Sequence, residues 1–522
     1  MIFNKQTISG IAQFRVRAHV VLNALLKLKE INIYYKSVTI SYENIAKLPV
    51  DGDCISILQN INIDSSDDDN DICENSDFIE NNVLALENMD HEQYISKELH
   101  LNYPSTSSEP INEFNSEGYI ASAFPTLFPT GNADFLQPRI IPLTRNEYFK
   151  HLMEFKDGRF AKDPRFRFYA LNTVMRHNAI SMSNLCMRDI KEKNCTVNRL
   201  REMIKNDSSI LGKIIVYSSS IKSSKGYWTK RCSELKNMVQ QLGKPTIFFT
   251  LSAADYHWPD LFGILCPEKR YEEISDDEKR KLMHDNPLLV GYFFQHRVNL
   301  FVEHVLKKVF NVKDYWYRFE WQSRGSPHIH GVLWLRDEPN YDINSISDEQ
   351  LQLLTEYFNK LCTAVHPSLN NEKSAQHPSQ TIFSDVPETD YIDDLSNLIN
   401  TFQRHTKCGS YCLKKVDGKL QCRFHFPHDL QETAHTNNNN GYYQFIPQRH
   451  DPLIQRYNKI LTLIWRANTD FSPIVDMNAI IKYIVKYATK NETSSKKYLE
   501  IIENLCKNDK KETPAKKHFV TC

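Results

Sequence analysis

The first part of the chain combines helical periodicity with a long polar stretch. Apolar residues recur at helical spacing over residues 14–35, and Val38-Thr-Ile40 predicts a short strand. Residues 62–118 are polar, acidic and low in aromatic side chains, which is typical of a flexible linker. Beyond it the periodicity predicts a helical region, with helices over 144–156, 166–181, 196–206 and 227–242.

From residue 246 the pattern predicts strands as well as helices. Thr246–Leu251 is an apolar run after Gly243 and Pro245, and it predicts a strand. Tyr315–Leu335 predicts two strands around a tight turn. Residues 370–400 are polar and predict a loop. Helices are predicted over 287–309, 346–366, 451–467 and 476–490. The combination predicts an α+β fold.

Composition places the chain among intracellular proteins without excluding a nucleic-acid partner. Lys+Arg and Asp+Glu each number 64, but the charges are unevenly placed, with acids around 64–71 and lysines from 482 to 517. A local basic surface matters more for DNA than the sum. Most of the twelve cysteines are scattered, as in a reduced protein. No signal pattern or bilayer-length apolar run is found, so we expect a soluble intracellular protein.

A histidine pair follows the tight turn of the predicted hairpin. His328 and His330 are two residues apart in an apolar strand, so both imidazoles project from one face. If the register pairs Gln322 with His328, then Gln322 and Glu320 share that face, and either offers an oxygen ligand for a divalent cation. Three ligands leave positions open for a phosphate, which suits Lewis-acid chemistry. The alternative is a pair of strand histidines at a protein surface.

Two tyrosines are four residues apart near the end of the sequence. Tyr483 and Tyr487 share one side of the helix predicted over 476–490, and Lys486 lies close to the same stripe. A tyrosine can attack a phosphodiester and form a covalent phosphotyrosine, and a nearby ammonium stabilises the developing charge. The alternative, which these residues alone favour, is that both tyrosines belong to the buried stripe of an amphipathic helix.

Cysteines and histidines cluster between residues 405 and 425. Their spacing is typical of a tetrahedral zinc site, which in an intracellular chain has a structural role. Five residues compete for four places, and the preferred set is His405, Cys408, Cys412 and Cys422, with His425 in reserve. The alternative is a chance group of reduced thiols.

Taken together, these motifs resemble those of the Helitron family of rolling-circle transposases. Phe319–His330 resembles the family's histidine-hydrophobic-histidine metal motif, and Tyr483–Tyr487 resembles its two-tyrosine motif. Gly243–Ser252 with His257–Asp260 resembles its first replication-initiator motif. Other stretches that fit are 21–26 with 48–49, 157–160, 164–172, 422–427 and 465–468.

The resemblance implies a fold and an activity. The implied fold is an HUH-type nuclease of the α+β class, in which helices flank a central antiparallel sheet. An N-terminal helical or α+β region and a small zinc-binding insertion accompany it. The implied activity is nicking and strand transfer on single-stranded DNA at transposon ends, in the nucleus. We therefore expect catalytic Mg²⁺ or Mn²⁺ and structural Zn²⁺.

The resemblance also implies residue roles. His328 and His330 would hold the catalytic cation with Gln322, and Glu320 is the reserve ligand. The tyrosines Tyr483 and Tyr487 become the nucleophiles, and Lys486 becomes a charge stabiliser or proton-transfer partner. Basic and aromatic side chains are candidates for gripping the DNA strand: Arg165, Arg167, Arg324 and Trp258.

We expect a multi-part organisation that follows these motifs. The parts are an N-terminal Helitron-associated region (1–61), an acidic linker (62–118), a helical segment (119–240), the nuclease core with the metal hairpin (241–400), the zinc cluster (401–430), the two-tyrosine part (431–492) and a basic tail (493–522).

The sequence departs from the family in one respect. Helitron proteins continue into an ATP-driven helicase, and no Gly-x4-Gly-Lys-Ser/Thr loop occurs in this sequence. We therefore expect a helicase partner that is encoded elsewhere or missing, and a chain that is a fragment, a decayed copy or one product of a split gene. The rival functions are a catalytically decayed or domesticated DNA-binding module and, last, a metal-dependent hydrolase of small molecules.

Overall fold

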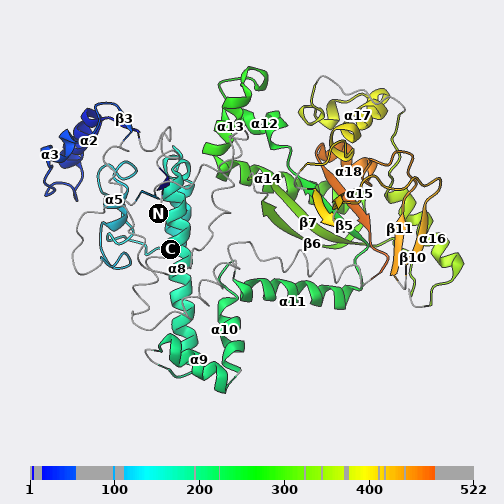
Figure 1. Ribbon diagram of the computed structural model, residues 1–522, viewed down its shortest axis with the longest axis horizontal. Helices are drawn as coiled ribbons and strands as arrows, with labels where there is room; N and C mark the ends of the chain where they lie inside the picture. The colour runs from blue at the N-terminus through cyan, green and yellow to red at the C-terminus, as the bar shows by residue number, and fades with distance from the viewer. Residues whose placement is uncertain are drawn as a thin grey trace. The chain divides into compact units, whose positions relative to one another are not determined.

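The protein forms two compact units, Met1–Ala170 and Leu171–Cys522, and each is described by itself (Figure 1). The computed structural model describes residues 3–4, 15–53, 98–99, 111–192, 195–207, 209–222, 224–321, 325–342, 345–368, 376–409, 412–416, 419–439 and 442–476. The finer division into seven parts remains a prediction.

Aromatic side chains form the core of the first unit. Phe166 is fully buried, and its ring lies 5.0 Å from Phe124 and 5.1 Å from Phe160. Phe166 belongs to α8 (Pro164–Asp189), Phe160 belongs to α7 (Arg159–Lys162), and Phe124 directly follows α5 (Tyr119–Ala123). The helix α6 (Arg145–Met153) lies between α5 and α7 in the chain. Packing of large rings over short helices holds together a region with few long elements.

The N-terminal part of the first unit differs in detail from the sequence prediction. The helix predicted over 14–35 is present but shorter, as α2 (Ala18–Ile31), and α3 (Tyr42–Ala46) follows it. The strand predicted at 38–40 is wrong, because those residues belong to no strand. The unit's strands are short pairs: β1 (Phe3–Asn4) with β4 (Glu98–Leu99), and β2 (Arg15–Val16) with β3 (Gly52–Asp53).

A four-stranded antiparallel sheet is the centre of the second unit. Its order is β12 (Thr469–Pro473), β5 (Ile247–Ser252), β7 (Pro327–Leu335) and β6 (Val312–Trp321). The strands predicted at 246–251 and within 315–335 are therefore confirmed. β7 is central and apolar, as expected for a strand that is covered on both faces.

Different helices cover the two faces of this sheet (Figure 1). On one face, Ile329 and Leu333 of β7 pack in the main core with Phe294 and Val298 of α14 (Pro287–Phe301). The prediction of one helix over 287–309 is confirmed, because α14 continues through the π-helical turn η5 (Val302–Leu306) into α15 (Lys307–Val309).

On the other face, Val332 and Trp334 pack against Leu235 of α11 (Lys225–Leu242). Strand alternation assigns His328 and His330 to this second face. The hairpin therefore presents its histidines towards the side that α11 covers.

The remaining helices of the second unit confirm some predictions and correct others. The helices predicted over 196–206 and 346–366 appear as α9 (Val197–Asn206) and α16 (Asp348–Leu361). The helix predicted over 451–467 is shorter in the structure, as α18 (Lys459–Trp465). The prediction of a loop over 370–400 is wrong for its later part, where residues form the helix α17 (Tyr391–Leu398). The helices without a counterpart in the sequence prediction are α10 (Ser209–Ser218), α12 (Pro259–Leu265) and α13 (Asp276–Asp285).

Two short hairpins complete the described part of this unit. They are β8 (Leu413–Val416) with β9 (Lys419–Cys422), and β10 (His435–Asn439) with β11 (Tyr442–Ile446). Helices and antiparallel sheets together make the fold α+β. No helix in the described ranges combines the length and apolarity that a bilayer crossing requires.

Candidate functional site

The β6–β7 hairpin brings together one carboxylate and two imidazoles. Glu320 is paired directly with His328, and Arg318 with His330. The register that would place Gln322 opposite His328 is therefore wrong by two residues. Because side chains alternate along a strand, a shift of two keeps Glu320 on the histidines' face. Gln322 and Arg324 lie outside the described residues.

The distances within this group suit a shared cation. Glu320 Oε2 is 3.7 Å from His328 Nε2 and 3.9 Å from His330 Nε2. These separations are too long for hydrogen bonds. Ligand atoms that each lie about 2.0–2.2 Å from one cation are themselves roughly 3–4 Å apart. The ligand atoms of all three residues lie within 4.8 Å of one another, so the group fits a divalent cation.

Burial strengthens that fit. The side chains of Glu320, His328 and His330 are 14 %, 12 % and 15 % exposed. Glu320 Oε1 is buried and has no hydrogen-bond partner in the described part of the chain. The Nε atom of Arg318 is 3.6 Å from this oxygen. A buried carboxylate oxygen without a hydrogen bond is costly, and a bound cation would offset that cost.

Side chains from other elements position the group. Thr250 Oγ1 of β5 lies 2.9 Å from His330 Nδ1, and Thr250 is paired with His330 in the sheet. If Nδ1 carries the proton and donates to Thr250, then Nε2 is left as an acceptor facing Glu320. The Arg318 guanidinium lies 3.8 Å from the ring centroid of Trp228, on α11. Thr250, Arg318 and Trp228 were not among the site residues predicted from the sequence. The one sequence signal was that Thr250 is a polar position in a predicted apolar strand.

The predicted zinc ligands also converge. His405 Nε2 lies 3.2 Å from Cys408 Sγ, 3.9 Å from Cys412 Sγ and 3.7 Å from Cys422 Sγ. The four ligand atoms lie within 4.8 Å of one another. The β8–β9 hairpin makes this possible, because Cys412 precedes β8 and Cys422 ends β9. The reserve residue His425 is exposed and is outside this group of four.

The predicted nucleophiles fall outside the part of the chain that the structure describes. This applies to Tyr483, Lys486 and Tyr487, since the description ends at Asp476. Their roles, and their approach to the histidines, remain predictions. The β12 strand precedes them in sequence, and in the sheet one strand, β5, lies between β12 and β7.

One predicted DNA contact is contradicted by burial. Trp258 is 2 % exposed, and its indole packs between Phe294, Trp465 and the Arg297 guanidinium. A ring with so little exposed surface cannot stack on a base from solvent, so Trp258 belongs to the core. The sequence pattern could not show this, because the surrounding residues come from distant elements.

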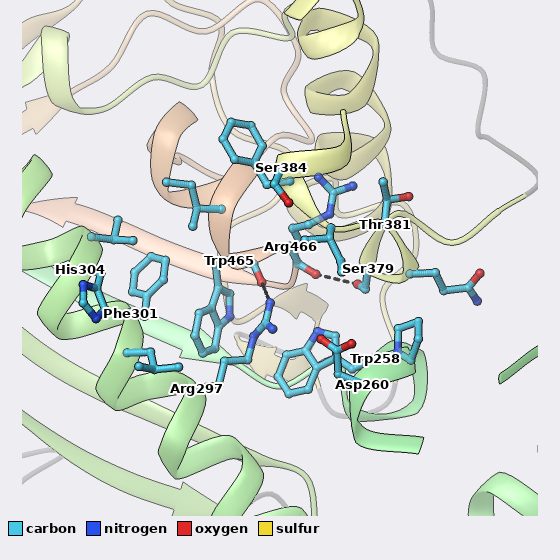
Figure 2. A pocket seen from close by; sticks show the side chains of 17 residues that line it. Trp258, Asp260, Arg297, Phe301, His304, Ser379, Thr381, Ser384, Trp465 and Arg466 are labelled. Carbon is cyan, nitrogen blue, oxygen red and sulfur yellow. Dashed lines mark hydrogen bonds between the residues drawn. The ribbon is translucent and has the colours of Figure 1, made fainter. Parts of the chain in front are cut away.

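Trp258 lines a cavity of about 410 Å³ whose walls come from α12, α14, α18 and residues 379–384 (Figure 2). Figure 2 shows Arg297 between Trp258 and Trp465, with its hydrogen bond of 3.1 Å to the Trp465 carbonyl oxygen. Burial lowers the pKa of Arg297 to about 10, although the charge of Asp260 opposes this shift. Arg297 therefore remains a cation at neutral pH.

Two further predicted DNA contacts belong to the first unit. Arg165 is exposed in the first turn of α8. Arg167 is partly buried, and its Nη1 donates a hydrogen bond of 2.8 Å to the Ala161 carbonyl oxygen. Arg167 therefore has a structural contact in addition to any role on DNA.

Comparison with known families identifies the region around the histidine cluster. Residues 148–333 match the family model of the Helitron helicase-like domain at the N-terminus. The matched span contains Thr250, Glu320, His328 and His330, and it ends before the cysteine cluster and the two tyrosines. No curated protein matches the chain. The domain match supports a Helitron-type protein.

Proposed function

We propose that the protein is a single-stranded DNA endonuclease and strand transferase of a rolling-circle transposon, since residues 148–333 match the family model of the Helitron helicase-like domain. The observation that carries the proposal is the approach of Glu320 Oε2 to both imidazole Nε2 atoms inside that domain. Histidine nitrogens with one carboxylate oxygen are a ligand set that divalent cations accept.

The cation site of the proposal consists of His328, His330 and Glu320, with Gln322 as the alternative oxygen ligand. Mg²⁺ or Mn²⁺ bound there would polarise a phosphoryl oxygen of the DNA backbone as a Lewis acid. The Thr250 hydroxyl orients the ring of His330 through Nδ1, and Arg318 faces the second oxygen of Glu320. Arg318 therefore leaves Oε2 as the oxygen that faces the imidazoles.

The proposed chemistry is a phosphoryl transfer that needs no further reactant. The phenol oxygen of Tyr483 or Tyr487 attacks the scissile phosphorus, and the bond between phosphorus and the 3′ oxygen breaks. The products are a 5′-phosphotyrosine and a free 3′-OH, whose proton is the one that the phenol loses. Lys486 would carry that proton or stabilise the charge. The second tyrosine would serve strand transfer.

The cysteine cluster has a separate, structural role in this proposal. His405, Cys408, Cys412 and Cys422 would hold Zn²⁺ and so close the β8–β9 hairpin. Zinc in such a closed set takes no part in the nicking chemistry.

A covalent-adduct assay tests the proposal. Full-length protein is incubated with a labelled single-stranded oligonucleotide and Mn²⁺, and denaturing electrophoresis detects DNA bound to protein. We expect an adduct in the wild type and none in Tyr483→Phe/Tyr487→Phe, with unchanged thermal stability. An adduct that survives in the double variant rules out the tyrosine mechanism. DNA binding without any adduct in the wild type favours the decayed DNA-binding module instead.

A further inference from the structure

The β8–β9 hairpin and its flanks carry an excess of exposed cations. They are Lys407, Lys414, Lys415, Lys419 and Arg423. Within the described residues, none of these five forms an ion pair with a carboxylate. Some exposed cations elsewhere do form such pairs, for example Arg280 with Asp277 and Lys269 with Glu278. The chain as a whole has a formal net charge of zero, so this positive surface is a local feature.

The strand register places Lys414 and Lys419 on the face of the hairpin opposite the metal-binding side, whereas Lys415, which is paired with Leu420, lies on the same face as Cys422. Lys414 is paired with Gln421, and Val416 with Lys419, so Lys414 and Lys419 share one face of the hairpin. Leu413 and Cys422 are paired on the other face, where the Cys422 thiol joins the ligand group. Like charges on one face of a two-stranded hairpin repel each other. A polyanion that binds there would remove that repulsion.

An exposed aromatic ring lies beside these charges. Phe424 is 44 % exposed, and the Arg423 guanidinium lies 4.7 Å from its ring centroid. Exposed rings interleaved with cations are typical of single-stranded nucleic-acid sites, in which cations contact phosphates and rings stack on bases.

We infer that the hairpin surface formed by Lys414, Lys419, Arg423 and Phe424 is a second contact for single-stranded DNA, in addition to the histidine cluster. The lysines and the arginine contact backbone phosphates, and Phe424 stacks on a base. The choice of DNA as the polyanion rests on the proposed function. The surface itself rests on the charges and exposure described above, and it requires no catalysis.

Equilibrium binding as a function of salt tests this inference. Fluorescence anisotropy measures binding of the full chain to a labelled single-stranded oligonucleotide, without added divalent cation, in Lys414→Gln/Lys419→Gln and in Phe424→Ala. The slope of log K against log salt is negative, and losing two phosphate contacts should reduce its magnitude by about 1.4. The same loss should weaken binding about tenfold at roughly 0.15 M salt. Phe424→Ala should weaken binding with little change in the slope, because it removes stacking rather than charge.

The matched control removes two exposed cations outside the hairpin, as Lys281→Gln/Lys308→Gln. It should leave the salt slope within error of the wild type. Zinc content and thermal midpoint are measured for every variant, to show that the hairpin is intact. Hairpin variants with the wild-type slope and affinity overturn the inference, as does an equal loss in the control.

These results separate the inference from the proposed function. Weakened binding in the hairpin variants, in a protein that forms no covalent adduct, supports the surface and rejects the nuclease. A covalent adduct in the wild type, together with wild-type DNA affinity in the hairpin variants, supports the nuclease and rejects the hairpin surface.

Discussion

Glu320 lies directly across the β6–β7 strand pair from His328, with its Oε2 atom 3.7 Å from the imidazole Nε2. The same oxygen lies 3.9 Å from Nε2 of His330. One carboxylate oxygen is therefore shared by two imidazoles whose side chains are mostly buried, an arrangement that a divalent cation would complete.

Thr250 should control cation affinity without contacting the cation. Its hydroxyl lies 2.9 Å from His330 Nδ1 and orients that ring. Thr250→Val should weaken Mn²⁺ binding about 10- to 100-fold, because partners of metal-ligating histidines have effects of that size. Isothermal titration calorimetry measures the affinity. Thr250→Ser keeps the hydroxyl and should bind like the wild type, and equal losses in both variants would contradict the positioning role.

Gly331 should tolerate no side chain between the histidine strand and its neighbours. A Cβ at this position would lie 2.5 Å from Phe249 Cε1 and 2.6 Å from the Trp316 carbonyl oxygen. Gly331→Ala should therefore cost about 1–3 kcal/mol of unfolding free energy, measured by denaturant titration. Gly263→Ala is the matched control, since nothing lies within 4 Å of a Cβ there. Equal stability of the two variants would contradict the close packing.

The cysteine cluster should bind one zinc ion per chain with a defined set of ligands. His405→Ala and Cys422→Ser remove members of the converging group and should lose the zinc measured by elemental analysis. His425→Ala should keep it, because His425 is outside that group. Loss of bound zinc in His425→Ala, with full zinc content in His405→Ala, would contradict the assignment of His405 rather than His425 as the histidine ligand.

Acid should destabilise the protein partly through His428. Burial, with the positive charges of Arg449 and Arg456, lowers the pKa of His428 to about 4 from an ordinary value of 6.5. Between these values the unfolded chain binds more protons than the folded one, so stability falls as pH drops from about 6.5 towards 4. The difference between denaturant midpoints at pH 7.5 and pH 5 should be smaller in His428→Gln. An identical difference in variant and wild type would contradict this contribution.

Local sequence patterns predicted the secondary-structure elements that carry the site. The alternation in His328-Ile-His330 assigned both imidazoles to one face, and the apolar run over 287–309 predicted the helix behind the sheet. Both depend only on periodicities of 2 and 3.6 residues. The histidine face and the existence of the hairpin could therefore be predicted without a structure.

The register and the long-range partners could not be predicted. A shift of two residues leaves the face of every side chain unchanged, so alternation did not separate Glu320 from Gln322 as the partner of His328. Thr250 lies 80 residues before His330, and Trp228 lies 90 residues before Arg318, and no local pattern encodes those contacts. Burial of Trp258 among α14 and α18 side chains is likewise a tertiary property, and it overturned a DNA-contact prediction.

The most direct test of the cation site is a measurement of Mn²⁺ bound per chain by electron paramagnetic resonance, in the wild type and in His328→Ala/His330→Ala. Circular dichroism and zinc content show that both proteins are folded. The wild type should bind one Mn²⁺ that the double variant does not bind, and Glu320→Gln should bind it more weakly. Full Mn²⁺ binding in the double variant would contradict the assignment of Glu320, His328 and His330 as the cation site.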